Sequence, residues 1–215
     1  MLSDPKKANL IPAKDKELVK SGKIPEMPRI DAKAMFWNMM KMARSPDPYM
    51  YPALKKLKAS GKFVMAALSN TTAFPEGVLD ENGKPFVNGI PKVEIAEVAR
   101  RQGVDYEMPR DREEKEDLRV NFDVFMSSAH IGMRKPEPKF YELAISEVNR
   151  VAKEKGLGPV KPEEILFLDD IGMNLKGAKK LGLGTIKVNL GRTIEAVREL
   201  QGRVGMQLLV EESRL

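Results

Sequence analysis

The residues of this sequence best suited to chemistry are two adjacent carboxylates, Asp169 and Asp170. They directly follow four apolar residues, 165–168, a run that is typical of a buried parallel strand. Open α/β sheets bind their ligands at the carboxyl ends of such strands, and two acidic side chains there can hold a hard cation such as Mg²⁺. The simpler alternative is a surface turn in which Asp170 and Asn174 cap the following helix.

A hydroxyl and an amide follow a second apolar run, residues 63–68. These side chains belong to Ser69 and Asn70, and together with backbone N–H groups they can bind a phosphate oxygen. The alternative is a turn whose side chains satisfy only its own backbone.

A lysine stands in a stiff loop after a third apolar run, residues 122–126. Lys135 precedes Pro136 within the segment 132–138, so its backbone is held in a narrow range of conformations. A lysine fixed in this way could neutralise a phosphate and a carboxylate nucleophile at once. The alternative is a solvent-exposed lysine, which is the usual place of this residue type.

The elements that must position these residues alternate along the chain. Apolar runs at 63–68 and 165–168 and shorter apolar stretches at 122–126 and 185–188 predict strands. Helical spacing predicts helices at about 31–43, 52–61, 93–102, 138–151, 175–181 and 193–201. This alternation predicts an α/β fold with a doubly wound parallel sheet. We therefore expect Ser69, Lys135 and Asp170 to converge at one edge of that sheet.

Composition narrows the possible functions. The 215 residues contain no cysteine and only one histidine, His130, so thiolate or histidine-rich metal sites cannot form. The net charge of +6 comes from lysines spread along the chain, and this does not favour nucleic acid. No apolar run approaches the roughly 20 residues that span a bilayer, and no signal peptide is evident, so we expect a cytoplasmic protein without membrane contact.

Taken together, these motifs resemble those of the haloacid dehalogenase (HAD) superfamily of aspartate-nucleophile hydrolases. Within it, the chain is most similar to the phosphatase domain at the front of soluble epoxide hydrolases and to the related domain of certain acyl-CoA dehydrogenases. The segments that carry this resemblance are 67–71, 132–138, 167–176 and 196–200.

The resemblance implies a Mg²⁺-dependent phosphatase that acts through an aspartyl-phosphate on a small phosphorylated substrate. Ser69 and Asn70 would bind the phosphoryl oxygens, and Lys135 would neutralise phosphate and nucleophile. Asp170 would ligate Mg²⁺, Asp169 would orient its neighbours as the second catalytic residue, and Asn174 would support the loop. Residues 1–50 would form an irregular N-terminus with a partial helical cap, and 51–215 the α/β core with a surface insertion at about 73–119.

One family feature is missing from the sequence. The family opens on an apolar strand ending in Asp-x-Asp, which supplies the nucleophile and lies in the middle of the sheet. None of the four aspartates before Ser69, at positions 4, 15, 31 and 47, follows an apolar run or has that spacing. We expect an N-terminally incomplete hydrolase that lacks its central strand, and the unfilled slot would invite a homo-oligomer.

Two alternatives remain open. The chain could be a catalytically inactive phosphate-binding or scaffold protein of the same fold. It could also be another doubly wound module, although a receiver has its acidic pair near the start of the chain and a nucleotide binder has a glycine-rich first turn. Neither feature is present.

Overall fold

In the computed structural model the chain divides into two compact units, residues 1–39 and 40–215. The structure describes residues 21–22, 31–71, 74, 77–80, 82–86 and 89–210. The irregular N-terminus expected at 1–30 lies outside the described residues, apart from 21–22. Helix α2 (Ala32–Met42) begins as predicted, because the Asp31 carboxylate accepts a hydrogen bond from the Ala34 N–H at 2.9 Å.

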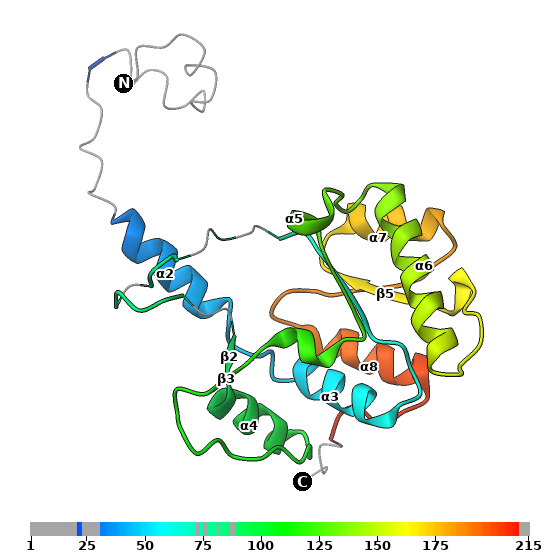
Figure 1. Ribbon diagram of the computed structural model, residues 1–215, viewed down its shortest axis with the longest axis horizontal. Helices are drawn as coiled ribbons and strands as arrows, with labels where there is room; N and C mark the ends of the chain where they lie inside the picture. The colour runs from blue at the N-terminus through cyan, green and yellow to red at the C-terminus, as the bar shows by residue number, and fades with distance from the viewer. Residues whose placement is uncertain are drawn as a thin grey trace. The chain divides into compact units, whose positions relative to one another are not determined.

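Four strands of the larger unit form two parallel pairs (Figure 1). Strand β1 (Ala66–Ser69) pairs with β4 (Val124–Ser127), and β5 (Leu166–Asp169) pairs with β6 (Gly184–Lys187). All four predicted strands are therefore present, within one to three residues of the expected bounds. The α/β class and the parallel pairing are confirmed, but the strands form two separate sheets of two strands each.

Helices cover both faces of these strands. Helices α6 (Pro138–Glu154) and α7 (Gly172–Lys180) cover one face of β5, where the Tyr141 and Phe167 rings meet edge to face at 5.6 Å. Helices α3 (Met50–Ser60) and α8 (Thr193–Val204) cover the other face, where Leu166 and Leu168 join their apolar core. Figure 1 shows the same three layers around β5.

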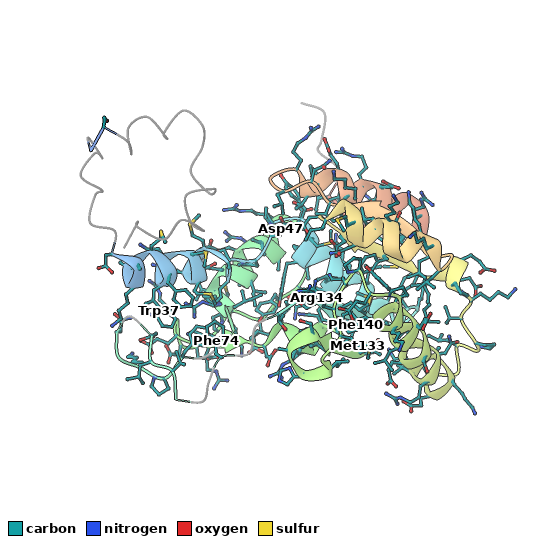
Figure 2. All side chains as sticks on the ribbon, turned by 90° about the horizontal axis from the view of Figure 1, so that it is seen from above. Trp37, Asp47, Phe74, Met133, Arg134 and Phe140 are labelled. Atoms are coloured by element: carbon teal, nitrogen blue, oxygen red, sulfur yellow. The ribbon has the colours of Figure 1, made fainter. Side chains whose placement is uncertain are left out.

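The sequence explains where these helices begin. The Asp47 carboxylate accepts hydrogen bonds from the N–H groups of Tyr49 and Met50, which starts α3. It also accepts one from the Thr193 hydroxyl at 2.7 Å, which joins the starts of α3 and α8. Helix α6 has Pro138 at its first position, and its apolar stripe begins with Phe140, which is fully buried beside Met133 (Figure 2).

The segment between β1 and β4 has more regular structure than its sequence indicates. The predicted helix is confirmed as α4 (Lys92–Arg101), and the structure adds β2 (Ile90–Pro91), β3 (Lys115–Glu116) and the 3-10 helix η3 (Leu118–Asn121). Strands β2 and β3 pair antiparallel, and Ile95 of α4 is fully buried. Residues 89–121 are therefore packed rather than irregular, because Ile90 and Ile95 pack against Tyr51 of α3.

Three smaller elements complete the described chain. They are α5 (Ser128–Ile131), the 3-10 helix η4 (Pro162–Glu164) and the segment after α8, where Leu208 and Leu209 are buried. No helix among the described residues is long and apolar enough to cross a membrane.

Candidate active site

The centre of the candidate site is an ion pair between two predicted residues. The Lys135 Nζ atom lies 2.7 Å from the Asp169 Oδ2 atom, and the two side chains are 12% and 4% exposed. The lysine ammonium also lies 5.6 Å from the centre of the Phe167 ring. Because both partners are buried and paired, each holds the other in one position.

The second oxygen of Asp169 is also occupied. Asp169 Oδ1 accepts a hydrogen bond from the Ile171 N–H at 2.8 Å and one from the Asn174 side-chain amide at 3.0 Å. The Asn174 carbonyl in turn accepts from the Tyr141 hydroxyl at 2.9 Å. Burial and the nearby Asp169 charge raise the pKa of Tyr141 to about 12, so this hydroxyl stays protonated and keeps donating.

The loop after β1 is tied to the lysine loop by a reciprocal pair of hydrogen bonds. The Asn70 side chain accepts from the Lys135 N–H at 2.9 Å and donates to the Lys135 carbonyl at 3.0 Å. Asn70 directly follows β1, and Asp169 ends β5, so Lys135 connects the carboxyl ends of both strands. The hydrogen bonds with Asn70 fix the Lys135 backbone, and the ion pair with Asp169 fixes its ammonium.

A glycine allows α7 to approach this loop closely. A Cβ atom at Gly177 would lie 3.1 Å from the Tyr141 ring and 3.3 Å from Pro136. The absence of a side chain here lets α7 pack directly against the loop that carries Lys135.

The structure places the remaining predicted residues at the same edge with fewer contacts. Ser69 is the last residue of β1, pairs with Ser127 in the strand register, and is half-buried. Asp170 is exposed, and its side chain forms no hydrogen bond or ion pair with the described residues. The structure thus brings together Asn70, Lys135, Asp169 and Asn174, and leaves Ser69 and Asp170 beside them.

Three polar residues at this edge were missed by sequence reasoning. The Thr71 and Ser127 hydroxyls are hydrogen bonded, and Ser127 is buried. The Ser128 hydroxyl accepts from the Thr71 N–H at 2.9 Å, which joins the ends of β1 and β4. The sequence contains a signal for two of them, because Ser127 and Ser128 follow an apolar stretch, as Ser69 does.

The described residues of this site provide few ligands for a metal ion. Among residues 31–71 and 89–210, and the shorter described stretches between them, no three acidic or histidine side chains are placed to hold a metal. Both oxygens of Asp169 already accept hydrogen bonds, which leaves the Asp170 carboxylate. Mg²⁺ prefers about six oxygens and often keeps several waters with one or two carboxylates. The described residues therefore do not form a complete magnesium site.

Two known proteins match part of this sequence. A segment of 93 residues, 43% of this chain, is 38% identical to bifunctional epoxide hydrolase 2 of Sus scrofa. A segment of 90 residues is 38% identical to acyl-CoA dehydrogenase family member 10 of Mus musculus. The matches span only 15% and 7% of those proteins. No established family profile matches the chain.

Two solved structures overlap with part of the chain. A HAD family enzyme of Bacteroides thetaiotaomicron, solved with magnesium and inorganic phosphate, is 28% identical and covers 38% of this chain and 36% of its own, with a TM-score of 0.27. A predicted HAD-like hydrolase of Porphyromonas gingivalis is 28% identical over 41% of this chain and 38% of its own, with a TM-score of 0.31. The sequence matches are to the two kinds of protein that the motifs of this chain resemble, a soluble epoxide hydrolase and an acyl-CoA dehydrogenase.

Proposed function

We propose that this chain functions in HAD-type hydrolysis of phosphate esters, and that its described residues form the phosphate-holding side of the site. The observation that carries this proposal is the Lys135 ammonium, which is buried against Asp169 at the end of β5, while its backbone is hydrogen bonded to Asn70 after β1. A lysine kept at a strand edge by two independent contacts is a preorganised cation, because no further side-chain ordering is needed when an anion arrives.

The neighbouring groups suit a phosphate ester. The Lys135 ammonium has three N–H donors, of which the Asp169 carboxylate uses one in the structure. The Ser69 hydroxyl and the backbone after β1 stand beside it as further donors to phosphoryl oxygens. Phosphoryl transfer depends chiefly on positioning and charge neutralisation, which is what these groups can provide.

We expect Mg²⁺ to bind together with the phosphate substrate. When bound, Mg²⁺ would neutralise part of the phosphate charge. The exposed Asp170 carboxylate is the residue we assign to it, with the remaining oxygens supplied by water and phosphate.

The nucleophile is not among the described strand-end residues. Asp169 is fully hydrogen bonded, and Asp123 lies at the amino end of β4, where it pairs with Lys58 and Lys155. A carboxylate in line with the phosphorus is required for an aspartyl-phosphate, and its removal elsewhere costs on the order of 10⁶ in turnover. We therefore expect this chain alone to bind phosphate without hydrolysing an aryl phosphate above background.

Phosphate binding tests the proposal. Inorganic phosphate titrated into the full chain should bind at least about tenfold more weakly to Lys135→Met, since a charge-assisted hydrogen bond is lost. The matched control is Lys161→Met, which removes the same charge before the amino end of β5 and should leave the affinity unchanged. Calorimetry measures both. Equal loss in the two variants would reduce the effect to net charge and contradict the proposal.

The same samples test the expectation about turnover. Hydrolysis of an aryl phosphate ester with Mg²⁺, abolished in Lys135→Met, would support the hydrolase and show that a nucleophile lies within this chain. A chain that neither binds phosphate nor hydrolyses the ester would overturn the proposed function.

A further inference from the structure

Three hydrogen-bonded side chains connect the loop after β1 to helix α5, and the proposed phosphate site does not use them. The Thr71 Oγ1 atom lies 2.5 Å from the Ser127 Oγ atom, which lies 3.1 Å from the His130 Nδ1 atom. Thr71 follows β1, Ser127 ends β4 and His130 belongs to α5. These three side chains, called the relay below, link an imidazole to the loop that carries Ser69.

The Thr71 hydroxyl lies on the face of the sheet that carries Ser69. The strand register pairs Ser69 with Ser127, and paired residues of neighbouring strands have their side chains on the same face. Thr71 contacts the Ser127 side chain and is itself exposed. An anion held at the end of β1 therefore meets the Thr71 hydroxyl on that face.

The backbone of Thr71 is fixed independently of the relay. Its N–H donates to the Ser128 hydroxyl at 2.9 Å, and its carbonyl accepts from the same hydroxyl at 3.2 Å. The preceding residue, Asn70, is held by the Lys135 backbone. The loop is thus held on both sides, and the direction of the hydroxyl proton is what can change at Thr71.

The protons of the relay have two arrangements. Ser127 is buried, and its hydroxyl has one proton to donate to either Thr71 or His130. If His130 Nδ1 accepts, Ser127 donates to it and Thr71 donates to Ser127, so no proton is left for a ligand. If Nδ1 carries a proton, it donates to Ser127, Ser127 donates to Thr71, and the Thr71 proton is free.

Protonation of His130 selects the second arrangement. A neutral imidazole accepts at one nitrogen and donates at the other, whereas an imidazolium donates at both. With His130 protonated, Thr71 accepts from Ser127 and has to turn its own proton outward. The positive charge also strengthens this donor, because hydrogen bonds in a chain polarise one another.

The groups around His130 do not supply a counter-charge. Within the part of the chain that the structure describes, no carboxylate forms an ion pair with His130. On the loop after α5, Arg134 pairs with Glu137 and Lys135 pairs with Asp169. The groups that face the imidazole from β4 and from the loop after β1 are the hydroxyls of the relay. A bound anion is therefore the natural counter-charge for the imidazolium.

We propose that Thr71 is a further anion-binding residue of the candidate site, and that His130, acting through Ser127, is the positioning residue that frees its proton. The site then binds a tetrahedral dianion more tightly when His130 is protonated. This inference rests on the proposed function, because it needs an anion at the loop after β1. It adds a pH-dependent donor to a site whose lysine is already paired.

Sulfate binding at two pH values tests the proposal. Sulfate is the probe because, unlike phosphate, it keeps the same two charges between about pH 5.5 and about pH 8. Histidine is the side chain whose charge normally changes in this range, and His130 is the only histidine of the chain. In calorimetry, the full chain should bind sulfate at least about threefold more tightly at the lower pH.

A pair of variants at Thr71 separates the hydroxyl from the charge of His130. Thr71→Val has nearly the same shape without the hydroxyl, and it should lose the pH dependence. Thr71→Ser keeps the hydroxyl and should retain it. A pH dependence that persists in Thr71→Val would overturn the proposal, because the imidazolium would then act without the relay.

A variant at the other end of the relay locates the titrating group. His130→Asn keeps a hydrogen-bonding amide near Ser127 but does not titrate, so sulfate affinity should be the same at both pH values. An unchanged pH dependence in this variant would also overturn the proposal. Thr71 and His130 are both exposed, so neither change removes a buried side chain, and circular dichroism checks the fold of each variant.

Lys135→Met distinguishes this inference from the proposed function. It should weaken sulfate binding at both pH values and leave their ratio unchanged, since the lysine is not part of the relay. A chain that binds sulfate through Lys135 with no pH dependence keeps the phosphate site and refutes the relay. A chain that binds no sulfate at either pH contradicts both.

Discussion

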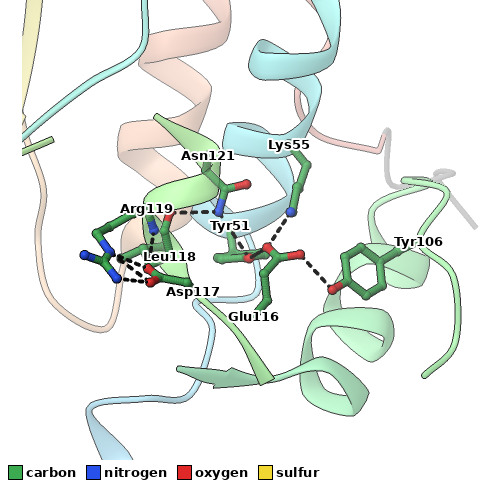
Figure 3. Close-up of polar contacts among 8 residues, drawn as sticks. All are labelled: Tyr51, Lys55, Tyr106, Glu116, Asp117, Leu118, Arg119 and Asn121. Carbon is green, nitrogen blue, oxygen red and sulfur yellow. Dashed lines mark hydrogen bonds and ion pairs between the residues drawn. The ribbon is translucent and has the colours of Figure 1, made fainter. Parts of the chain in front are cut away.

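Two carboxylates in this protein have nearly the same hydrogen-bonding pattern and opposite surroundings. Glu116 accepts from the Lys55 ammonium and from the Tyr51 and Tyr106 hydroxyls (Figure 3). Asp169 likewise accepts from one ammonium and from two neutral donors, the Ile171 N–H and the Asn174 amide. The number of contacts therefore does not distinguish a structural carboxylate from one at a candidate site.

The difference lies in what borders each cluster. The Lys55 ammonium lies 5.5 Å and 5.4 Å from the centres of the Tyr51 and Tyr106 rings, so two aromatic rings flank the cation of the Glu116 cluster. Burial is the main cause that raises the pKa of Tyr51, and its hydrogen bond to Glu116 is the second. The Tyr51 phenol therefore stays protonated and remains a donor. Asp169 instead stands beside the exposed Asp170 and near the exposed Asn70.

A carboxylate whose oxygens all accept hydrogen bonds can therefore serve two purposes. Around Glu116 it joins α3 to the segment 89–121 through one lysine and two tyrosines. Around Asp169 it fixes a cation at an open strand edge, where an incoming anion can share it. Loss of the carboxylate should therefore destabilise the chain at both clusters, and added phosphate should restore stability only at Asp169.

The largest loss of stability is expected from Asp169→Asn. The change leaves the Lys135 ammonium buried without its partner, and breaking a buried pair costs about 3 kcal/mol of unfolding free energy. Urea unfolding measures this loss. Millimolar phosphate should restore part of it, because an anion that binds only the folded chain stabilises it. No recovery with phosphate would break the comparison, since Asp169 would then be as closed a site as Glu116.

A smaller loss is expected from Glu116→Gln. Glutamine keeps one accepting oxygen, so it can still accept from one of the two tyrosine hydroxyls, and Lys55 keeps two aromatic rings. We therefore expect a loss of about 2 kcal/mol in urea unfolding. Phosphate should restore none of it. The control is Glu147→Gln, which breaks an exposed pair with Arg150 and should cost less than about 1 kcal/mol.

The pH dependence of this loss follows from the pKa of Glu116. Burial alone would raise that pKa, but hydrogen bonds from Lys55, Tyr51 and Tyr106 outweigh burial and lower it. A carboxylate with a lowered pKa in the folded state stabilises above its unfolded pKa, about 4.3, and loses this contribution as the pH falls further. The stability difference between the unaltered chain and Glu116→Gln should therefore shrink below about pH 4. An unchanged difference at pH 3 would contradict the assigned ion pair.

Much of the fold and of the Asp169 cluster follows from the sequence. Continuous apolar runs identify β1 and β5, shorter apolar stretches identify β4 and β6, and in an α/β alternation the residues after such strands lie at one edge. That rule predicted that Ser69, Lys135 and Asp170 converge, and the structure connects Lys135 to Asn70 and Asp169, the chain neighbours of the other two. It also missed Ser127 and Ser128, to which it applies equally well.

The Glu116 cluster could not be predicted in the same way. Glu116 lies 65 residues from Tyr51 and 61 from Lys55, in a charged stretch with almost no apolar residue. No periodic pattern marks such a stretch as buried, and its partners are chosen by packing of the whole segment. Helix α4 was predictable because its own spacing shows it, whereas β2 and β3 are two residues each, too short for any pattern.

The smallest effect is expected at Asp170, the exposed neighbour of Asp169. Because its side chain makes no hydrogen bond or ion pair with the described residues, Asp170→Ala should change the unfolding free energy by less than about 0.5 kcal/mol. Its effect should appear only with metal. Mg²⁺ should bind the unaltered chain weakly, since one carboxylate and water leave the ion mostly hydrated, and more weakly still after the substitution. Asp169→Asn should not weaken it, because both oxygens of Asp169 already accept hydrogen bonds. Calorimetry that shows tight Mg²⁺ binding, undiminished in Asp170→Ala, would place the metal elsewhere and remove Asp170 from the site.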